Sequence, residues 1–279
     1  MRRLTPLILF LLLAVAGYLV YRLSAGVDTY DLWVVVGQSN GEGRGDASAS
    51  VAPDPDTAFE ITPAGTLRPL LDPVGGARSG SMWPAFAREY VSVTGHKVLL
   101  IEQAHGGTCL TASCAGDDAR HWDVRENAWH YGTALGWTRL GLQRARALRP
   151  SAEIRLGGWI LVQGESDAIA IEDDRTTARD YADALGALLD SADVALGEID
   201  AGARVLVVQT GTRRSGDNAA WATVRGAQDS VASARGALAS TAAVRFADAG
   251  LMADELHWSQ AALDAVGRDA AAVAGRTRP

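Results

Sequence analysis

Short apolar runs that alternate with helix-length segments constrain the fold of this chain more than any other feature of its sequence. The apolar runs have the length of buried strands and occupy residues 32–36, 98–101, 154–162, 205–209 and 244–247. Helix-length segments occupy residues 83–93, 128–148, 176–195, 218–234 and 259–274, and the last four show helical spacing of Ala, Leu and Val. Fully apolar strands that alternate with helices indicate a parallel sheet covered on both faces. The sequence therefore predicts an α/β fold, a flavodoxin-like three-layer α/β/α sandwich around a five-stranded parallel sheet.

The length and charge of the chain limit the classes of protein that it can be. With 279 residues it is long enough for one large domain with a substantial core, and two full domains are less favoured. A net charge of −7 gives no electrostatic reason to expect nucleic acid as a partner. Residues 47–81 are rich in Pro, Gly, Asp and Ser, and we expect this long irregular segment to wall the functional site. The sequence gives no indication of the oligomeric state.

The first 25 residues predict export. Arg2 and Arg3 precede an apolar stretch over residues 4–20. This stretch is slightly long for the roughly 7–15-residue core of a cleaved signal peptide and near the lower end of the roughly 17–25 residues that span a bilayer. We expect an uncleaved signal anchor over residues 1–25 that tethers the domain of residues 26–279 to the membrane, outside the cytoplasm. A cleaved signal peptide is the alternative, and it also exports the domain.

Cys109 and Cys114 are the two cysteines of the chain. An oxidising compartment lets such a close pair form a disulfide that pins a loop, and four intervening residues make the bond sterically feasible. Two unpaired, small apolar side chains are the alternative. Because there is no further cysteine and no cluster of histidines, we expect neither a zinc site nor another cofactor.

A serine follows the first apolar run in the turn Gly37-Gln38-Ser39-Asn40-Gly41. A tight, glycine-flanked turn after a buried strand exposes such a hydroxyl where open α/β folds place their ligands. Near the other end of the chain, Asp254-Glu255-Leu256-His257 supplies a histidine base and an acid to orient it. The two motifs predict a serine hydrolase with Ser39 as nucleophile. A helix N-cap is the alternative for Ser39, and Asp248 is a rival for the acid.

The pattern Gly37-x-Ser39-x-Gly41 also fits the nucleophile elbow of the α/β-hydrolases. In that fold several strands precede the nucleophile, whereas here only a short stretch separates the N-terminal apolar segment from Ser39. The acid of that fold also lies well before the histidine, while Asp254 and His257 share one short loop. We therefore expect Ser39 to follow the first strand, and the elbow pattern is a minor alternative.

Five sequence blocks follow one another in a fixed order through the domain. They are Gly37-Gln38-Ser39-Asn40, Gly80-Ser81-Met82-Trp83-Pro84, His105-Gly106-Gly107-Thr108, Trp159-Ile160-Leu161-Val162-Gln163-Gly164-Glu165-Ser166-Asp167, and Asp254-x-x-His257 with Gly267-Arg268 after it. Together they resemble the SGNH hydrolases and, among these, carbohydrate esterase family 6 in its sialate O-acetylesterase-like (SASA) branch. Gly41 and Trp258 stand where this branch often has methionine and proline. Neither departure removes a reacting atom, so they bear on substrate fit more than on chemistry.

The resemblance implies an SGNH hydrolase fold and a serine esterase. The enzyme would remove O-acetyl groups from an acetylated carbohydrate through an acetyl-serine intermediate, with Ser39, His257 and Asp254 as its catalytic triad. No cofactor is implied. Acetylated xylan, sialic acid, a cell-wall glycan and a capsular polymer all remain open as substrates.

Other residues are expected to complete the site. The backbone N–H groups of Ser39 and Gly107 are candidates for the oxyanion hole, since glycine permits close approach, and Gln163 offers a side-chain amide where other SGNH enzymes place asparagine. A simple turn at Gly107 and a capped strand end at Gln163 are the alternatives. Gln38 and Glu165 are implied as supports of the site, Glu165 through hydrogen bonds.

Aromatic and basic residues supply candidate substrate contacts. Trp122 lies in a Gly/Asp-rich loop and is predicted to stack on a sugar ring, as aromatic faces do. Trp129 and Trp137 are eight residues apart and share similar helix faces, which is equally typical of core packing, and we expect Trp137 in the core. Arg44 and Arg78 are candidates for contact with an acidic sugar, although such arginines are more often solvated loop charges.

Two other functions are compatible with the same residues. An O-acetyltransferase would pass the acetyl group to a glycan instead of to water, and the choice depends on whether the acceptor excludes water. A catalytically silent glycan-binding module would use the fold without the chemistry. The intact Ser39, Asp254 and His257 count against this last alternative.

Overall fold

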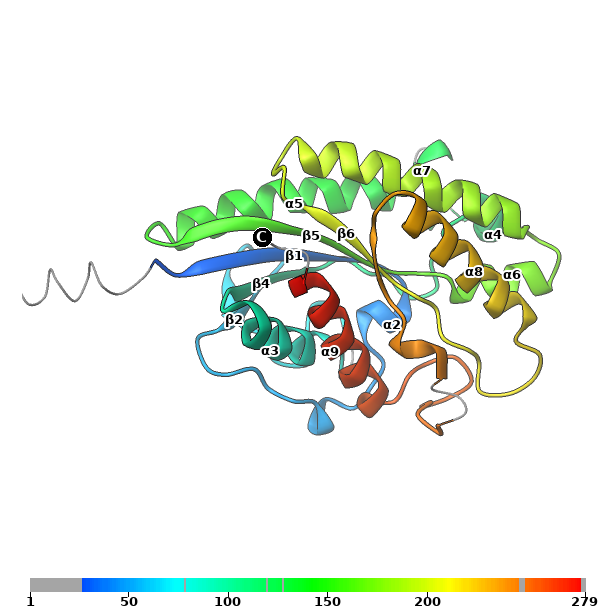
Figure 1. The fold of residues 1–279 in the computed structure, drawn as a ribbon, viewed down its shortest axis with the longest axis horizontal. Helices are drawn as coiled ribbons and strands as arrows, with labels where there is room; N and C mark the ends of the chain where they lie inside the picture. Colours follow the sequence, from blue (N-terminus) through cyan, green and yellow to red (C-terminus); the bar gives the residue numbers. More distant parts are fainter. Residues whose placement is uncertain (1–26, 78, 119, 127, 246–248, 277–279) are drawn as a thin grey trace, which may run out of the picture.

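The computed structural model, drawn in Figure 1, describes residues 27–77, 79–118, 120–126, 128–245 and 249–276. The predicted signal anchor over residues 1–25 lies outside the described residues, as do Arg78 and Asp248. Within the described ranges, no helix is both long enough and apolar enough to cross a membrane.

A seven-stranded sheet forms the centre of the molecule, with the strand order β3-β2-β4-β1-β5-β6-β7. The strands are β1 (Thr29–Gly37), β2 (Ala58–Ile61), β3 (Leu67–Pro69), β4 (Lys97–Glu102), β5 (Glu153–Val162), β6 (Arg204–Val208) and β7 (Leu238–Ser240). Neighbouring strands run parallel except β2 and β3, which are antiparallel. The predicted α/β sandwich is therefore confirmed, while the five-stranded parallel sheet is corrected to a mixed sheet of seven strands.

The two additional strands lie in the irregular segment of residues 47–81. β2 pairs with the distant β4 on one side and with the adjacent β3, in a short antiparallel hairpin, on the other, so its place in the sheet depends on a long-range partner rather than on a local apolar pattern. The described residues of this segment do not line the cavity at Ser39. Its expected role as a wall of the site is therefore wrong, because the segment extends the edge of the sheet instead.

The predicted strand over residues 244–247 is also wrong. Ala242–Arg245 form a 3₁₀ turn, and the last two residues of the prediction lie outside the described part of the chain. The edge strand is β7, which pairs with β6 alone and is only partly buried. An edge strand of this kind has no fully apolar run to mark it.

Helices cover both faces of the sheet. They are α2 (Ser39–Glu42), α3 (Trp83–Thr94), α4 (Ala112–Ala115), α5 (Trp129–Leu148), α6 (Glu165–Glu172), α7 (Ala178–Gly197), α8 (Ala219–Ala234) and α9 (Gln260–Arg276). The five predicted helices are confirmed as α3, α5, α7, α8 and α9, while the shorter α2, α4 and α6 were not expected. Figure 1 shows α5 and α7 on one side of the sheet and α3 and α9 on the other.

The side chains of β1 show how the two layers are formed. Leu32, Val34 and Val36 pack into the core on the face covered by α5, α7 and α8. Trp33 and Val35, which alternate with them, pack into the core under α3 and α9. A strand buried on both faces needs apolar residues at every position, which is why this run is continuous in the sequence.

Candidate active site

The turn that carries Ser39 begins where β1 ends. Gly37 has a φ of 125°, and an added Cβ would lie 2.0 Å from the carbonyl oxygen of Val162, so only glycine fits beside the end of β5. Gln38 donates its backbone N–H to the same oxygen at 2.9 Å. The chain then enters α2, whose first residue is Ser39. The serine therefore lies at the carboxyl edge of the sheet.

Ser39, His257 and Asp254 form a continuous hydrogen-bonded line. His257 Nε2 lies 3.0 Å from Ser39 Oγ, and His257 Nδ1 lies 2.7 Å from Asp254 Oδ2. Because Nδ1 faces a carboxylate oxygen, its N–H donates there and Nε2 is left to accept the serine proton. The distances suit a base that takes a proton from a hydroxyl while a carboxylate fixes its tautomer.

Asp254 is held in its ionised form although the protein partly desolvates it, and its side chain remains 58% exposed. Burial is the largest single influence on its pKa and acts to raise it. Hydrogen bonds from the backbone and side chain of His257 and from the backbone N–H of Leu256 outweigh that effect and lower the pKa of Asp254 below its usual value. The carboxylate is thus negative across the neutral pH range, where it accepts the hydrogen bond from His257 Nδ1.

Asn40 holds in place the loop that carries His257, here called the histidine loop. Sequence reasoning missed this role. Its buried side chain accepts the N–H of Trp258 at 3.2 Å and donates to the carbonyl oxygen of Leu256 at 3.3 Å, so it contacts the residues on both sides of His257. Its Nδ2 also donates to Glu165 Oε1 at 2.7 Å. The only signal in the sequence was its position directly after the serine.

Glu165 lies behind Asn40 at the start of α6. Burial raises the pKa of the Glu165 carboxyl group, and the hydrogen bond from Asn40 opposes this only in part. Its Oε2 has no hydrogen-bond partner among the described residues. Glu165 therefore supports the amide that positions the histidine loop, and its raised pKa favours a neutral carboxyl group there.

Gln38 and Gln163 belong to a buried hydrogen-bond network behind the serine turn. Gln163 Nε2 donates to Gln38 Oε1 at 2.9 Å, to the Thr108 carbonyl oxygen at 3.0 Å and to Asp167 Oδ2 at 3.2 Å. Gln163 is 1% exposed, and these acceptors take up the N–H groups of its side-chain amide. The amide therefore has no N–H group left for an oxyanion, and the predicted place of Gln163 in the oxyanion hole is wrong. Gln38 Oε1 also accepts the backbone N–H of Ser166 at 3.2 Å, which ties the serine turn to α6.

Two backbone N–H groups remain as oxyanion candidates, those of Ser39 and Gly107. Gly107 has a φ of 78°, and its neighbour Gly106 lies so close to the serine that an added Cβ would be 3.6 Å from Ser39 Cβ. Gly106 itself is fixed by its N–H, which donates to Glu42 Oε2 at 3.1 Å. Neither the Ser39 nor the Gly107 N–H donates to another described residue, so both are available to a ligand.

The triad and Gly107 open onto one cavity. Its volume is about 510 Å³, and its walls include Ser39, His257, Asp254 and Gly107. Arg44 also lines it, with its guanidinium paired at 2.6 Å to a glutamate two residues earlier. Among the described residues, no group of three or more His, Cys, Asp or Glu side chains is placed to hold a metal ion.

The tryptophans are placed differently from the prediction. Trp122 is 0% exposed and stacks on His130 with the ring centroids 5.2 Å apart. No sugar can reach its face, so the predicted stacking contact is wrong. Trp137 is partly buried and packs against the core, as expected. Trp129 is 63% exposed and lies at the surface.

Cys109 and Cys114 form a disulfide, which confirms that prediction. The bond links the segment that follows the Gly107 turn to the short helix α4. It therefore pins one side of the loop that presents a candidate oxyanion donor.

Comparisons with solved structures show the same fold. A protein of Arabidopsis thaliana is 19% identical with a TM-score of 0.63, and the match covers 88% of this chain and 98% of that one. A carbohydrate acetylesterase of Xanthomonas citri is 20% identical with a TM-score of 0.57 over 88% of this chain and 56% of that one. A putative GDSL-like lipase of Parabacteroides merdae is 11% identical with a TM-score of 0.53 over 89% of this chain and 98% of that one. A search of curated proteins found no match.

The family comparison covers nearly the whole described chain. Residues 29–275 match the family described as carbohydrate esterase, sialic acid-specific acetylesterase. This match confirms the resemblance that the five sequence blocks indicated. The chain therefore belongs to the sialic acid-specific acetylesterase family of carbohydrate esterases, and it is a carboxylic ester hydrolase with the SGNH-type fold.

Proposed function

We propose that this chain hydrolyses O-acetyl esters of a carbohydrate through a covalent acetyl-Ser39 intermediate. The observation that carries the proposal is the line of contacts from Ser39 Oγ to His257 Nε2 at 3.0 Å and from His257 Nδ1 to Asp254 Oδ2 at 2.7 Å. A weak nucleophile next to a base that is itself oriented by an acid is the arrangement that activates a serine hydroxyl.

The first half of the reaction acetylates the enzyme. Ser39 Oγ attacks the ester carbonyl carbon while His257 Nε2 takes its proton. The bond between that carbon and the sugar oxygen then breaks, and His257 returns the proton to the departing sugar hydroxyl. Ionised Asp254 stabilises the positive charge that His257 carries between the two proton transfers.

The second half releases acetate. His257 takes a proton from a water molecule that attacks the acetyl carbon, and the proton then returns to Ser39 as the ester bond breaks. In both halves the carbonyl oxygen becomes negative, and the free N–H groups of Ser39 and Gly107 are the donors proposed to stabilise it. One such donor contributes roughly 3–4 kcal/mol in the best-studied enzyme.

Kinetics of three full-length proteins test the proposal, with 4-nitrophenyl acetate and glucose pentaacetate as substrates. Ser39→Ala is expected to lower kcat at least about a thousandfold on both. Ser48→Ala is the matched control, because this exposed serine bonds only to Asp46 among the described residues and its loss is expected to leave kcat unchanged. Equal turnover by wild type and Ser39→Ala would refute Ser39 as the nucleophile. Acetyl transfer to an added sugar in preference to water would replace hydrolysis with the transferase alternative.

We also propose that the catalytic domain is exported and tethered by residues 1–25. The support is Arg2 and Arg3 before the apolar stretch of residues 4–20, together with a disulfide of the kind that persists in oxidising compartments. A C-terminally tagged chain is expected in the membrane fraction and accessible to protease from outside the cytoplasm. Recovery from the cytoplasmic fraction would contradict export, and release into the medium would favour a cleaved signal peptide.

A further inference from the structure

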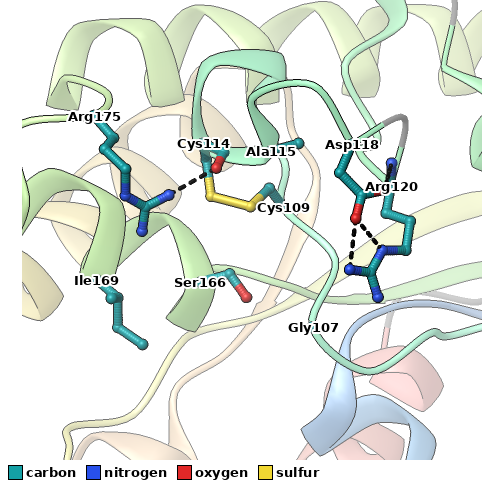
Figure 2. A pocket seen from close by; sticks show the side chains of 9 residues that line it. All are labelled: Gly107, Cys109, Cys114, Ala115, Asp118, Arg120, Ser166, Ile169 and Arg175. Carbon is teal, nitrogen blue, oxygen red and sulfur yellow. Dashed lines mark hydrogen bonds and ion pairs between the residues drawn. A yellow bond between two sulfur atoms is a disulfide. The ribbon is translucent and has the colours of Figure 1, made fainter.

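A second cavity, drawn in Figure 2, shares lining residues with the cavity at Ser39. Its volume is about 250 Å³, and its walls include Gly107, Ser166 and Ile169, all of which also line the first cavity. The two cavities therefore meet at a shared wall that carries the proposed oxyanion donor of Gly107. This shared wall places the second cavity next to the ester of a substrate that binds at Ser39.

The walls of the second cavity are held by covalent and hydrogen bonds. The disulfide between Cys109 and Cys114 forms part of the wall, and Arg175 donates to the carbonyl oxygen of Cys114 at 2.8 Å. On the shared side, the N–H of Ser166 donates to Gln38 Oε1 at 3.2 Å. The cavity and the serine turn are thus connected through Gln38, and a ligand would not have to order either.

The lining combines apolar and polar groups. The disulfide, Ala115 and Ile169 supply apolar surface, while Arg175 and the ion pair of Asp118 with Arg120 stand on opposite sides of the disulfide in Figure 2. A sugar ring suits such a lining, since its C–H faces are apolar and its edge carries hydroxyl groups. An alkyl chain would remove these charged groups from water without offering a hydrogen bond, which is costly.

The size of the cavity also favours a single ring. At about 250 Å³ it is smaller than the roughly 300–1,000 Å³ of pockets for drug-sized ligands, yet much larger than the methyl group of an acetyl ester. The acetyl side of the substrate therefore does not need this space. The alcohol side of the substrate, which is the sugar, does need a space of this size.

We propose that the disulfide-walled cavity is a subsite for a sugar ring on the alcohol side of the acetyl ester. The inference rests on the proposed function, because it takes the reacting ester to lie at Ser39. In addition, the glycan would bind on the far side of Gly107 from Ser39, between Arg175 and the Asp118–Arg120 pair. Binding there positions a sugar ester but contributes nothing to a small aryl ester.

Filling the cavity tests this subsite in the full-length protein. Ala115 lines the second cavity and not the first, so Ala115→Phe is the substitution that should fill the proposed sugar position and leave the lining at Ser39 unchanged. We expect the KM for glucose pentaacetate to rise about tenfold or more with kcat nearly unchanged, and kcat/KM for 4-nitrophenyl acetate to stay within about twofold. Peracetylated xylose, galactose and N-acetylglucosamine serve as further sugar esters.

A second variant keeps the test decisive if Ala115→Phe folds poorly. Arg120 is 62% exposed, lines only the second cavity and is paired with Asp118, so Arg120→Ala is expected to raise the KM for the sugar esters in the same selective way. Arg179→Ala is the matched control, because Arg179 is 92% exposed on α7 and lines neither cavity. It is expected to change neither substrate's kinetics.

The remaining outcomes separate the subsite from the proposed function. If Ala115→Phe and Arg120→Ala hydrolyse 4-nitrophenyl acetate and their kinetics with the sugar esters are unchanged, the subsite is overturned. It is also overturned if the wild type hydrolyses 4-nitrophenyl acetate but none of the sugar esters. Selective loss of 4-nitrophenyl octanoate hydrolysis would show an acyl pocket instead. Absence of all ester turnover by wild type refutes the proposed function itself.

Discussion

Removing the Asn40 side chain should lower the stability and the activity of the enzyme together. Asn40 is 1% exposed and makes hydrogen bonds of 2.7 Å to Glu165, 3.3 Å to Leu256 and 3.2 Å from Trp258. At about 1 kcal/mol for each hydrogen bond, Asn40→Ala should reduce the free energy of unfolding by about 3 kcal/mol. The same bonds hold the loop of His257, and a displacement of about 1 Å at a reacting group costs about a hundredfold in rate.

Two measurements separate these effects. Urea unfolding gives the loss of stability, and kcat and KM for 4-nitrophenyl acetate, measured where the variant is fully folded, give the loss of activity. Thr138→Val is the matched control, since Thr138 is buried and accepts the Nε1–H of Trp159 at 2.9 Å away from the site. It should lose stability and keep its kcat. If folded Asn40→Ala keeps kcat within about twofold of wild type, Asn40 does not position His257.

Three further predictions concern stability. Burial raises the pKa of Glu102 to about 8, so the native state retains a proton that the unfolded chain releases, and the free energy of unfolding should fall as pH rises from 4.5 to about 8. Glu102→Gln should remove this part of the slope in urea unfolding, and an identical slope in both proteins would contradict the assignment. Gly37→Ala should cost more than about 2 kcal/mol, because its Cβ would lie 2.0 Å from Val162 O, and an unchanged urea midpoint would refute that steric argument. Replacing both Cys109 and Cys114 by serine should cost about 2 kcal/mol through the short loop that the bond closes, and equal midpoints for the variant and the oxidised wild type would count against it.

The parts of the fold that local patterns determine were predictable from the sequence. β1 and β5 are buried on both faces and therefore have continuous apolar runs, and long helices such as α7 place apolar residues at helical spacing. The meeting of Ser39 with His257 was also expected, because the order of the five sequence blocks resembles a known family. The short strands β2 and β3 were not predicted, since β2 joins the sheet by pairing with the distant β4 and β3 pairs with β2 alone.

The errors within the site concern side-chain direction rather than position along the chain. Gln163 lies at the end of β5, close to Ser39 as expected, yet its amide faces Gln38, Thr108 and Asp167 in the interior. Trp122 lies in a loop, where exposure was expected, but its ring is buried against His130 and its Nε1–H donates to Thr108 Oγ1. Neither direction is encoded in residue spacing, since each depends on tertiary contacts, which for Gln163 reach Gln38 on another strand end and for Trp122 reach Thr108 and His130.

Detection of the acetyl-enzyme tests the central claim most directly. Wild type and Ser39→Ala would be mixed with 4-nitrophenyl acetate, quenched in acid within the first turnovers, digested and analysed by peptide mass spectrometry. We predict an acetyl group on Ser39 of the wild type, with a matching burst of 4-nitrophenol, and neither signal in the variant. Acetylation of another residue, or turnover by Ser39→Ala at the wild-type rate, would contradict the mechanism.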